Sequence, residues 1–584
     1  MDNRPTFPSA RRMSRRRVLR GAALGLAGLA GAALVGCASD EGGVTVTTST
    51  PTPTGTPEPA TTVAAPRFDG TLRLHLAAPP ASLDPYAGVA GGGFTSRTIA
   101  GHLYSRLLRV AADPDRDPWS TGTAPDLAEG IETQDGRVWT ITLRAGVRFH
   151  DVPAVSGREV IADDVVASVE RLKAVDSPGA ALVTHWSQVQ AVDDRTVRFT
   201  LAAPSAAFPD ELADIDRLLV LPREAVEGDI DITSTPVGSG PWVLDEYDPE
   251  TRFRLRANPA LTPEAAPLLP TLEYAFLDDD AALARFRSGD LHGLPLRSDA
   301  VLPLRGEQRE VQWRGHVSPL LSFLYFSGDD AEAPWRDERF RQAVSLLQDR
   351  DALTQAAYNL SAFRDVGLDA PVRWNNLVPA GFTRWWLDPT SGEQGDGARF
   401  FVHDPAEARR LLDASGYTGE PIPFLLPAEV YGASFDAVAD ALVVSAAAVG
   451  LNLVPERQDF ASEYVARTFR GDFTGMAFGY QSAFTEVGEY FTRMFGAGDT
   501  NHGRVGDAVI DDLVERQAIA LDEGERRSLI HEIQRRNAEQ MYYVPSQAGT
   551  GLLWTAYHPQ LRGIRQTRGA GGGAEVNPYL SFEA

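Results

Sequence analysis

The sequence predicts a mixed α/β protein that is built from more than one domain. The chain has 584 residues, whereas single hydrophobic cores stop growing at about 250–300 residues. Segments with a strand pattern and segments with a helix pattern are interleaved along the whole chain, which favours the α/β or α+β class. With 43% hydrophobic and 23% charged residues the composition is globular, and outside the first 40 residues no apolar stretch is long enough to span a bilayer.

Four segments alternate apolar and polar residues, as strands with one buried face do. These are residues 70–76, 138–143, 196–201 and 252–256. The second follows an Asp-Gly turn and places Trp139, Ile141 and Leu143 on one face. We expect the fourth to bury Phe253 and Leu255 and to expose the arginines that alternate with them.

Three segments have apolar residues at helical spacing. In one, Asp404 is a candidate N-cap, Pro405 occupies the first helical position, Glu407 follows, and Gly416 ends the helix. A second helix is expected after Asp337. The residues expected to be buried are Leu411 and Leu412 in the first helix, Phe340, Ala343, Val344 and Leu347 in the second, and Leu529, Ile530, Ile533 and Met541 in the third.

The first 36 residues have the features of an export signal. Arg15 and Arg16 lie in the run SRRRVL, which resembles a twin-arginine motif. The apolar run 21–35 that follows has 15 residues, which is short for a spanning helix and typical of a signal peptide. It ends in LVGC, which resembles a lipobox, and Cys37 is the only cysteine of the chain. We therefore predict a twin-arginine lipoprotein signal peptide at 1–36 and a lipidated Cys37, with an uncleaved N-terminal anchor as the alternative.

Residues 37–67 are rich in threonine and proline and show no periodicity, so we expect a semi-extended linker after the lipidated cysteine. Each lipid methylene adds about 0.8 kcal/mol of membrane affinity, so two or three acyl chains hold a protein firmly. These features predict an extracytoplasmic protein that is anchored to the outer face of the cytoplasmic membrane.

Charge and residue usage exclude several function classes. The net charge is −24, and removal of residues 1–36 leaves about −30, a surface that repels nucleic acids. The single lysine, Lys173, lies in RLKA, which excludes a P-loop. No two of the ten histidines form an H-x-x-x-H pair, and there is no G-x-S-x-G motif. We therefore expect no enzyme, no metal site and no cofactor, and a hydrolase with dispersed residues is a remote alternative.

A series of short motifs carries a family resemblance. In chain order they are LDPY (83–86), PDLA (125–128), LRAGVRFHD (143–151), ADDV (162–165), PVGSGPW (236–242), RANP (256–259), FRSGDL (286–291), DERFRQA (337–343) and DPAEARRLLDASGY (404–417). In order and spacing, over roughly residues 70–565, the chain resembles the family 5 extracellular solute-binding proteins, the oligopeptide- and dipeptide-binding components of ABC importers.

The resemblance implies a bilobal, type II periplasmic-binding-protein fold with an extra subdomain in lobe one. We expect lobe I at 68–318 with 545–584, the extra subdomain at about 99–231, and lobe II at 319–544. It also implies that the lobes close on a peptide-like or other small solute, which a monomeric lipoprotein delivers to the permease and ATPase subunits of an ABC importer. A surface sensor or chaperone-like binding lipoprotein without transport is the alternative.

The resemblance places a ligand site in the segment that contains Tyr480, Gln481, Ser482, Ala483, Phe484 and Glu486. Oligopeptide binders of the family tend to carry an aspartate here that pairs with the α-ammonium of the peptide, and by spacing that place falls on Ala483. A buried ammonium without a counter-charge costs several kcal/mol. Either Glu486, the nearest carboxylate, substitutes for the aspartate, or the ligand is not a free peptide; we favour the second.

Aromatic residues outside this segment are further candidates. Trp374, Asn375 and Trp385 combine stacking surfaces with an amide, which suits a sugar, a modified peptide or an aromatic ligand. The resemblance implies that the segment containing Tyr325 passes near the hinge. Packing in a core is the alternative for the aromatic candidates, Tyr480 and Phe484 included. We expect the Gly238-Ser239-Gly240 turn and the His150-Asp151 pair to be structural.

Overall fold

The structure is a computed structural model, and it describes residues 44–46, 70–88, 93–112, 122–175, 178–263, 265–296, 298–317, 321–328, 330–368, 373–428, 430–481, 484, 486–496, 501–546, 552–565 and 575–583. Cys37, the predicted signal peptide and most of the predicted linker lie outside these residues. Within the described ranges, no helix is both long and apolar enough to cross a membrane.

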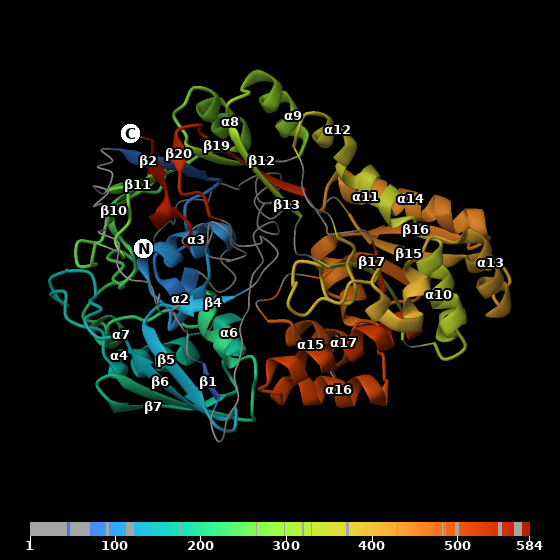
Figure 1. The fold of residues 1–584 in the computed structure, drawn as a ribbon, viewed down its shortest axis with the longest axis horizontal. Helices are drawn as coiled ribbons and strands as arrows, with labels where there is room; N and C mark the ends of the chain where they lie inside the picture. Colours follow the sequence, from blue (N-terminus) through green and yellow to red (C-terminus); the bar gives the residue numbers. More distant parts are fainter. Residues whose placement is uncertain are drawn as a thin grey trace, which may run out of the picture.

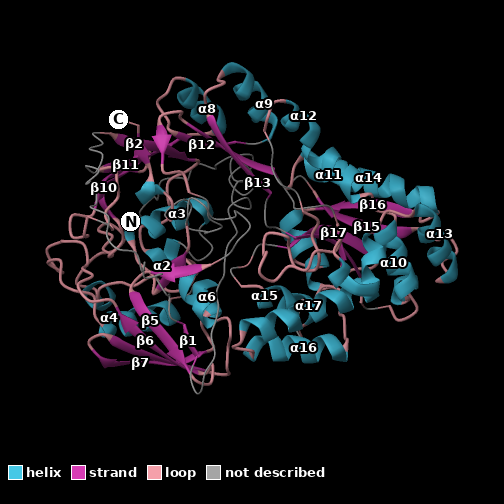
Figure 2. Cartoon of the chain, in the orientation of Figure 1, coloured by secondary structure: helices cyan, strands magenta, loops and turns pink. Residues whose placement is uncertain are grey.

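The chain folds into two bodies that lie side by side (Figure 1). The first body contains the elements up to β13 and, from the C-terminal end, β19 to β21. The second body contains the elements from β14 to β18. Both bodies combine helices with sheets, as Figure 2 shows, so the predicted α/β class is confirmed.

The described residues of the first body form three larger sheets and two short pairs. The first sheet, in spatial order, is β1 (Val44–Val46), β5 (Ala128–Thr133), β6 (Val138–Leu143), β8 (Thr196–Leu201) and β7 (Trp186–Asp193). The second is β2 (Thr71–Leu76), β11 (Thr271–Phe276), β10 (Arg252–Ala257) and β9 (Trp242–Asp248). The third is β12 (Gly293–Leu296), β19 (Leu552–Tyr557) and β13 (Gln312–Val317). The pairs are β3 (Leu108–Val110) with β4 (Thr123–Pro125) and β20 (Leu561–Arg562) with β21 (Ser581–Phe582).

Helices cover these sheets. They are α2 (Pro85–Gly88), α3 (Gly93–Leu103), α4 (Ala162–Ala174), α5 (Pro178–Leu182), α6 (Phe208–Ala213), α7 (Arg223–Glu227), α8 (Asp279–Arg287) and α9 (Ser298–Glu307), with a 3-10 turn η5 (Asn577–Tyr579) near the C-terminus. One continuous hydrophobic core joins the first two sheets to residues 561–580 of the C-terminal segment. The chain therefore begins and ends its folded part in the same body.

The predicted strands of the first body are confirmed. In β6 the three residues Trp139, Ile141 and Leu143 are buried and alternate with less buried neighbours. In β10 Phe253 and Leu255 are fully buried, while the arginines between them are at least partly exposed. The alternation works as a predictor here because each of these antiparallel strands has one face on the core and one toward water.

The predicted linker differs from expectation at one place. Residues 44–46 form β1, which pairs with β5 in antiparallel register, Val44 opposite Thr133. These residues read Val-Thr-Val, and β-branched residues favour extended pairing. The linker is therefore not a free tether along its whole length.

The second body is built on one mixed sheet. Its spatial order is β16 (Leu453–Gln458), β15 (Ile422–Pro427), β17 (Met476–Gln481), β14 (Leu321–Phe326) and β18 (Val544–Pro545). Its helices are α10 (Glu338–Leu346), α11 (Arg350–Tyr358), α12 (Leu360–Asp365), α13 (Pro405–Ala414), α14 (Ala433–Val449), α15 (Gly488–Phe495), α16 (Ala508–Ile519) and α17 (Glu523–Gln540). Shorter helical turns are η1 (Pro334–Arg336), η2 (Gly392–Phe401), η3 (Phe460–Val465) and η4 (Thr468–Arg470).

This sheet separates two cores, which we call the α14 core and the α17 core. Phe478 and Tyr480 of β17 belong to the α14 core with residues of α10, α13 and α14. Ala477 of β17 and Tyr325 of β14 belong to the α17 core with residues of α15, α16 and α17. Successive strand residues point to opposite faces, so the two cores take alternate residues of each strand.

The predicted helices of the second body are confirmed. The side chain of Asp404 accepts hydrogen bonds from the backbone N–H groups of Ala406 and Glu407, so it caps α13. Gly416 follows the last turn with φ of 83°, the left-handed conformation that favours glycine after a helix. The residues predicted to be buried in the three helices are all buried, although Leu347 and Met541 lie just beyond the helix ends.

The chain passes between the bodies at two neighbouring places. β13 and β19 pair in the third sheet of the first body, and β14 and β18 pair in the sheet of the second. Both crossings therefore join the same two sheets, and we refer to this end of the molecule as the hinge end. A fourth apolar cluster lies at this end and joins α8 and α9 to Tyr358, Phe363 and Leu368.

The expected structural roles of the Gly238-Ser239-Gly240 turn and of the His150-Asp151 pair are consistent with the packing of the first body. A Cβ atom at Gly238 would lie 2.1 Å from the carbonyl oxygen of Leu103, so only glycine fits this close backbone approach. His150 is fully buried, and its backbone N–H donates to the carbonyl of Gly238 at 2.8 Å. This histidine supports the turn.

Candidate ligand-binding site

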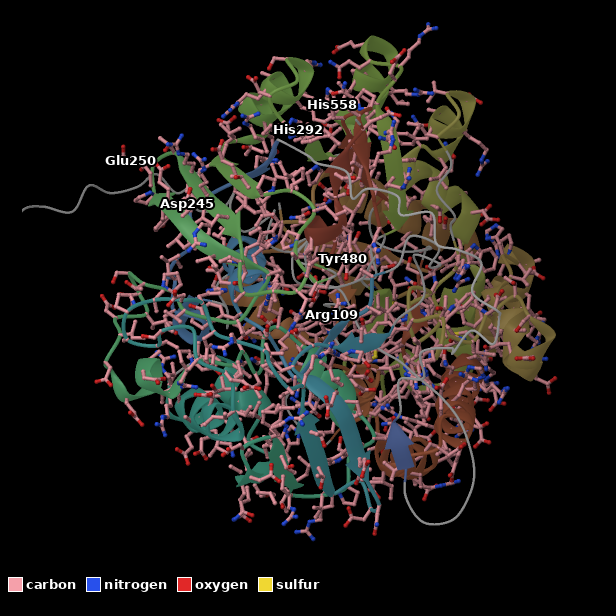
Figure 3. The ribbon with its side chains drawn as sticks, turned by 60° about the vertical axis from the view of Figure 1, so that its left-hand side comes forward. Arg109, Asp245, Glu250, His292, Tyr480 and His558 are labelled. Atoms are coloured by element: carbon pink, nitrogen blue, oxygen red, sulfur yellow. The ribbon has the colours of Figure 1, made fainter. Side chains whose placement is uncertain are left out.

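The predicted site begins at the end of β17. Tyr480 is mostly buried in the α14 core, where its ring lies 4.5 Å from that of Tyr431 and 5.3 Å from that of Phe435, measured between centroids. Figure 3 shows Tyr480 near the middle of the molecule. Burial holds the pKa of Tyr480 well above its usual range, so the phenol stays neutral. Its ring is part of an aromatic cluster.

Gln481 is the last residue of β17 and is only 2% exposed. Its side-chain carbonyl oxygen is buried and has no hydrogen-bond partner among the described residues. A buried acceptor without a partner costs roughly 1–3 kcal/mol, so such an atom is a place where a ligand donor gains binding energy. Ser482 and Ala483, which follow, lie outside the described residues.

Phe484 packs against the α17 core and not against the α14 core. Its ring centroid lies 4.8 Å from that of Tyr490, and the guanidinium of Arg493 lies 4.9 Å from the ring centre. Phe484 and Tyr480, four residues apart, therefore belong to opposite faces of the sheet.

Glu486 forms an internal ion pair. Its side chain is almost fully buried, and Arg526 donates to its carboxylate at 2.5 Å. The backbone N–H of Gly488 donates to the same carboxylate at 2.6 Å, and Arg526 also donates to Gln517 at 3.1 Å. The charge of Glu486 is thus balanced within the protein.

Two of the other aromatic candidates are fully buried. The ring of Trp385 lies between the guanidinium groups of Arg384 and Arg526, at 4.2 and 5.0 Å, and within the described part of the chain its indole N–H has no hydrogen-bond partner. The hydroxyl of Tyr325 donates to that of Tyr464 at 3.0 Å, inside the α17 core. Both packing modes are those of core residues.

Trp374 and Asn375 lie on a loop that reaches toward the α14 core. The indole N–H of Trp374 donates to Asp351 at 2.8 Å, and its ring packs at the edge of that core. The side-chain oxygen of Asn375 accepts from the backbone N–H of Ala380 at 3.0 Å, so the amide shapes its own loop. The structure brings Trp374 and Tyr480 to one core, and Trp385, Phe484 and Tyr325 to the other.

The bodies also meet at the end away from the hinge, at a contact that we call the closing interface. It joins residues 205–217 of the first body, which include α6, to Arg384 and residues 486–526 of the second body (Figure 1). Arg217 donates to the carboxylate of Glu489 at 2.6 Å across it. The backbone N–H of Ala206 donates to the carbonyl of Ala518 at 2.8 Å.

This interface was not predicted from the sequence. The signal that was present is the run DELADID at 210–216, four acids within seven residues, followed by Arg217. A run of this kind is ordinarily a solvated surface, but Asp210, Glu211, Asp214 and Arg217 are buried. Their partners lie up to 272 residues away, which is why spacing alone does not reveal them.

The described residues contain no group of three or more histidine, cysteine, aspartate or glutamate side chains that could hold a metal ion. Two histidines, His292 and His558, pack edge to face with ring centroids 5.9 Å apart (Figure 3). Nδ1 of His292 accepts from the backbone N–H of Arg73 at 2.9 Å, so this nitrogen is engaged. A surface hollow of about 440 Å³ nearby is lined by residues of α8, the end of α9 and His558.

Comparison with known proteins gives consistent results. A family profile described as bacterial extracellular solute-binding proteins, family 5 middle, matches residues 122–502. The dipeptide-binding protein of Escherichia coli (strain K12) is 27% identical over 379 residues, which cover 61% of this chain and 65% of that protein. Heme-binding protein A of Haemophilus influenzae is 23% identical over 499 residues, which cover 81% of this chain and 86% of that protein.

The same fold is found among solved structures. The unliganded open form of MppA, a periplasmic murein tripeptide-binding protein, superposes with a TM-score of 0.71 at 20% identity. The superposition covers 89% of this chain and 99% of that chain. The relatives with this fold are thus named for ligands as different as a dipeptide, heme and a murein tripeptide.

Proposed function

The chain belongs to the family 5 bacterial extracellular solute-binding proteins, and from this premise we propose that it captures a small solute between its two bodies and delivers the solute to an ABC importer. The predicted bilobal type II fold is shared with the solved relatives. Capture requires no bond to be made or broken. It requires only that the solute bind the closed arrangement better than the open one.

The observation that carries this proposal is the pair of contacts between the bodies. They are joined by two neighbouring strand connections at one end, and they touch through Arg217 and Glu489 at the other. Two rigid bodies with a hinge at one end and a separate contact at the other can open without unfolding either core. We propose lobe I at 68–318 with 545–584 and lobe II at 319–544 as these two bodies, in a monomer.

For the ligand, we propose a peptide-like or other small solute whose recognition does not rest on an ammonium–carboxylate pair in the 480–486 segment. The sequence has Ala483 where the resemblance places an aspartate, and the carboxylate of Glu486 is already paired with Arg526. The side-chain acceptor of Gln481, which has no partner among the described residues, supports a ligand that offers a neutral hydrogen-bond donor. We propose Ser482, Phe484 and Trp374 as further contacts from their place in the sequence, and such contacts suit a ligand with apolar surface.

We also propose that the protein reaches its place by export and lipidation. The family is extracellular, and the motif LVGC supports attachment of lipid to Cys37 once residues 1–36 are removed. The partners in this proposal are the permease and ATPase subunits of the importer.

The test is ligand identification on the intact mature protein. Native mass spectrometry of protein purified from its own membranes reports a bound solute as added mass. Thermal-shift measurements with dipeptides, tripeptides, sugars and metal chelates follow, since a ligand at 100 times its Kd adds about 2.7 kcal/mol to stability. Large shifts with free dipeptides would contradict the proposed ligand class, and failure to crosslink to any permease in membranes would contradict the transport role.

A further inference from the structure

Helix α6 is a short helix that is buried on both sides. Phe208 and Leu212 point into the core of the first body. Asp210 lies between them in sequence, is only 5% exposed, and interacts electrostatically with Arg384 and Arg526 of the second body. The helix is therefore enclosed by the meeting of the two bodies.

The closing interface has apolar and polar parts. Leu521, from the turn between α16 and α17, packs against the core of the first body. A Cβ atom placed on Gly136 would lie 3.0 Å from a methyl group of this leucine, so the two bodies are in direct contact there. The charged side chains of Asp210, Glu211, Asp214 and Arg217 are buried in the same interface, so these charges lose hydration when the bodies meet.

Carboxylates outnumber guanidinium groups at this interface. The carboxylates are Asp210, Glu211, Asp214, Glu486 and Glu489, with Glu523 at the edge; the guanidinium groups are Arg217, Arg384 and Arg526. Arg217 forms ion pairs with Glu211, Asp214 and Glu489. Arg526 pairs with Glu486, and Arg384 pairs with Glu523. Each of these three guanidinium groups is thus engaged in at least one ion pair with another carboxylate, and among the described residues none of these pairs includes Asp210.

Asp210 makes no side-chain hydrogen bond and no ion pair within the described residues. The charged groups that act on it are Arg384 from the 373–387 loop, Arg526 from α17, Glu486 from the segment before α15, and Glu211 from its own helix. Two of these groups are positive and two are negative, so their effects on Asp210 largely oppose one another. Loss of hydration is the effect that remains.

We propose that Asp210 binds a proton when the two bodies close, so that closing becomes more favourable as the pH falls. This inference rests on the proposed capture of a solute by closing. Burying a neutral carboxylic acid in this interface costs less free energy than burying a carboxylate, because only the charged form loses strong hydration. In the open arrangement the same group faces water and keeps its ordinary acidity.

The sign and size of the effect follow from linkage. In the closed arrangement burial raises the pKa of Asp210 from 3.8 to about 7, although the positive charge of Arg384 acts in the opposite direction. Between these two values the closed form holds a proton that the open form does not, so closing is favoured on going down in pH. The closed-to-open ratio is expected to rise about tenfold between pH 8 and pH 6 from this one group.

Glu489 acts in the same direction. Burial raises its pKa to about 7, while Arg217 lowers it and Asp214, Glu486 and Arg493 also act on it. Its ion pair with Arg217 crosses the interface, so its removal changes closing for a second reason. The test therefore compares variants of Asp210 with the parent protein and leaves Glu489 in place.

The closed-to-open ratio can be measured without any solute. The full chain with Cys37→Ser contains no other thiol, so Val192→Cys on β7 and Val509→Cys on α16, both at exposed positions, accept a pair of fluorophores. Single-molecule energy transfer then counts closed and open molecules at pH 8 and pH 6. Asp210→Asn keeps the shape of the side chain but holds no titrating proton, and its ratio is expected to change about tenfold less than that of the parent.

Asp245→Asn alters an exposed carboxylate of β9 whose ion pair with Arg254 of β10 lies within the first body and outside the closing interface, so the pH dependence should remain that of the parent. Asp210→Ser serves as a second neutral variant, and circular dichroism checks that each variant is folded. If the closed-to-open ratio of Asp210→Asn depends on pH as it does in the parent protein, the inference about Asp210 is wrong while the proposed function stands. A single fixed distance at every pH would show that the bodies do not open, and would overturn the proposed function as well.

Discussion

The buried ion pair of Glu486 and Arg526 gives the sharpest prediction about the candidate site. Both side chains are almost fully buried, and they are 2.5 Å apart. The substitution Glu486→Gln keeps the shape of the side chain and removes its charge, so the guanidinium of Arg526 is left buried without its counter-charge. We expect this variant to lose stability in the absence of any ligand.

The magnitude follows from the burial. Removing one partner of a buried ion pair costs about 3–5 kcal/mol, because the remaining charge keeps its full desolvation penalty. For a domain of 150–250 residues each kcal/mol shifts Tm by about 2–4 °C, so the expected fall in Tm is about 6–20 °C. Adding Arg526→Met to the same protein removes the orphaned charge and should recover most of the loss, since an apolar side chain of similar volume replaces it.

Urea unfolding followed by circular dichroism measures the free energy of unfolding for the parent protein, the single variant and the double variant. A cost below about 1 kcal/mol for Glu486→Gln would refute the reasoning, since an exposed ion pair is worth no more than that. In that case Glu486 would be accessible to solvent, and its role as the counter-charge of a peptide ammonium would return.

Three further predictions follow. Gly238→Ala should cost more than about 3 kcal/mol in thermal unfolding, because its methyl group would lie 2.1 Å from a carbonyl oxygen, whereas Gly146→Ala, with open space and φ of 78°, should cost only about 1–2 kcal/mol. Burial lowers the pKa of His150 from 6.5 to about 4, so the unfolded chain takes up a proton first and stability should fall by about 3 kcal/mol from pH 6.5 to pH 4. His150→Gln should flatten that fall in urea titrations, and an unchanged slope would contradict the assignment. Cys37→Ser should move the protein from the membrane pellet to the soluble fraction, with no lipid mass on its N-terminal peptide; a variant that stays in the pellet would refute lipid anchoring through this residue.

Local patterns predicted the elements of this fold well. The alternation in 138–143 and 252–256 identified which side chains of β6 and β10 are buried, and Asp404 and Gly416 marked the ends of α13. In each case the controlling interactions join residues a few positions apart, or one face of an element to whatever core lies beneath it. Such information is present in spacing alone.

The candidate site was predicted less completely. The sequence singled out Tyr325, Trp385 and Glu486 because of their residue types and their neighbourhood in the chain. The structure places Tyr325 in a core, Trp385 between two guanidinium groups, and Glu486 in an ion pair with a residue 40 positions away. The face on which a strand residue lies and the partner that a charge finds depend on which elements pack together.

By itself, then, the sequence determined the α/β class, the positions of the four strands and three helices for which the pattern is clear, and, through its chain of motifs, the family. The tertiary structure alone decided that the run 210–216 is enclosed between two bodies and that Arg217 reaches Glu489 across 272 positions. The physical reason is that hydrogen-bonded elements form from neighbours in the chain, whereas hydration is lost, and pKa values move, only where distant parts of the chain meet.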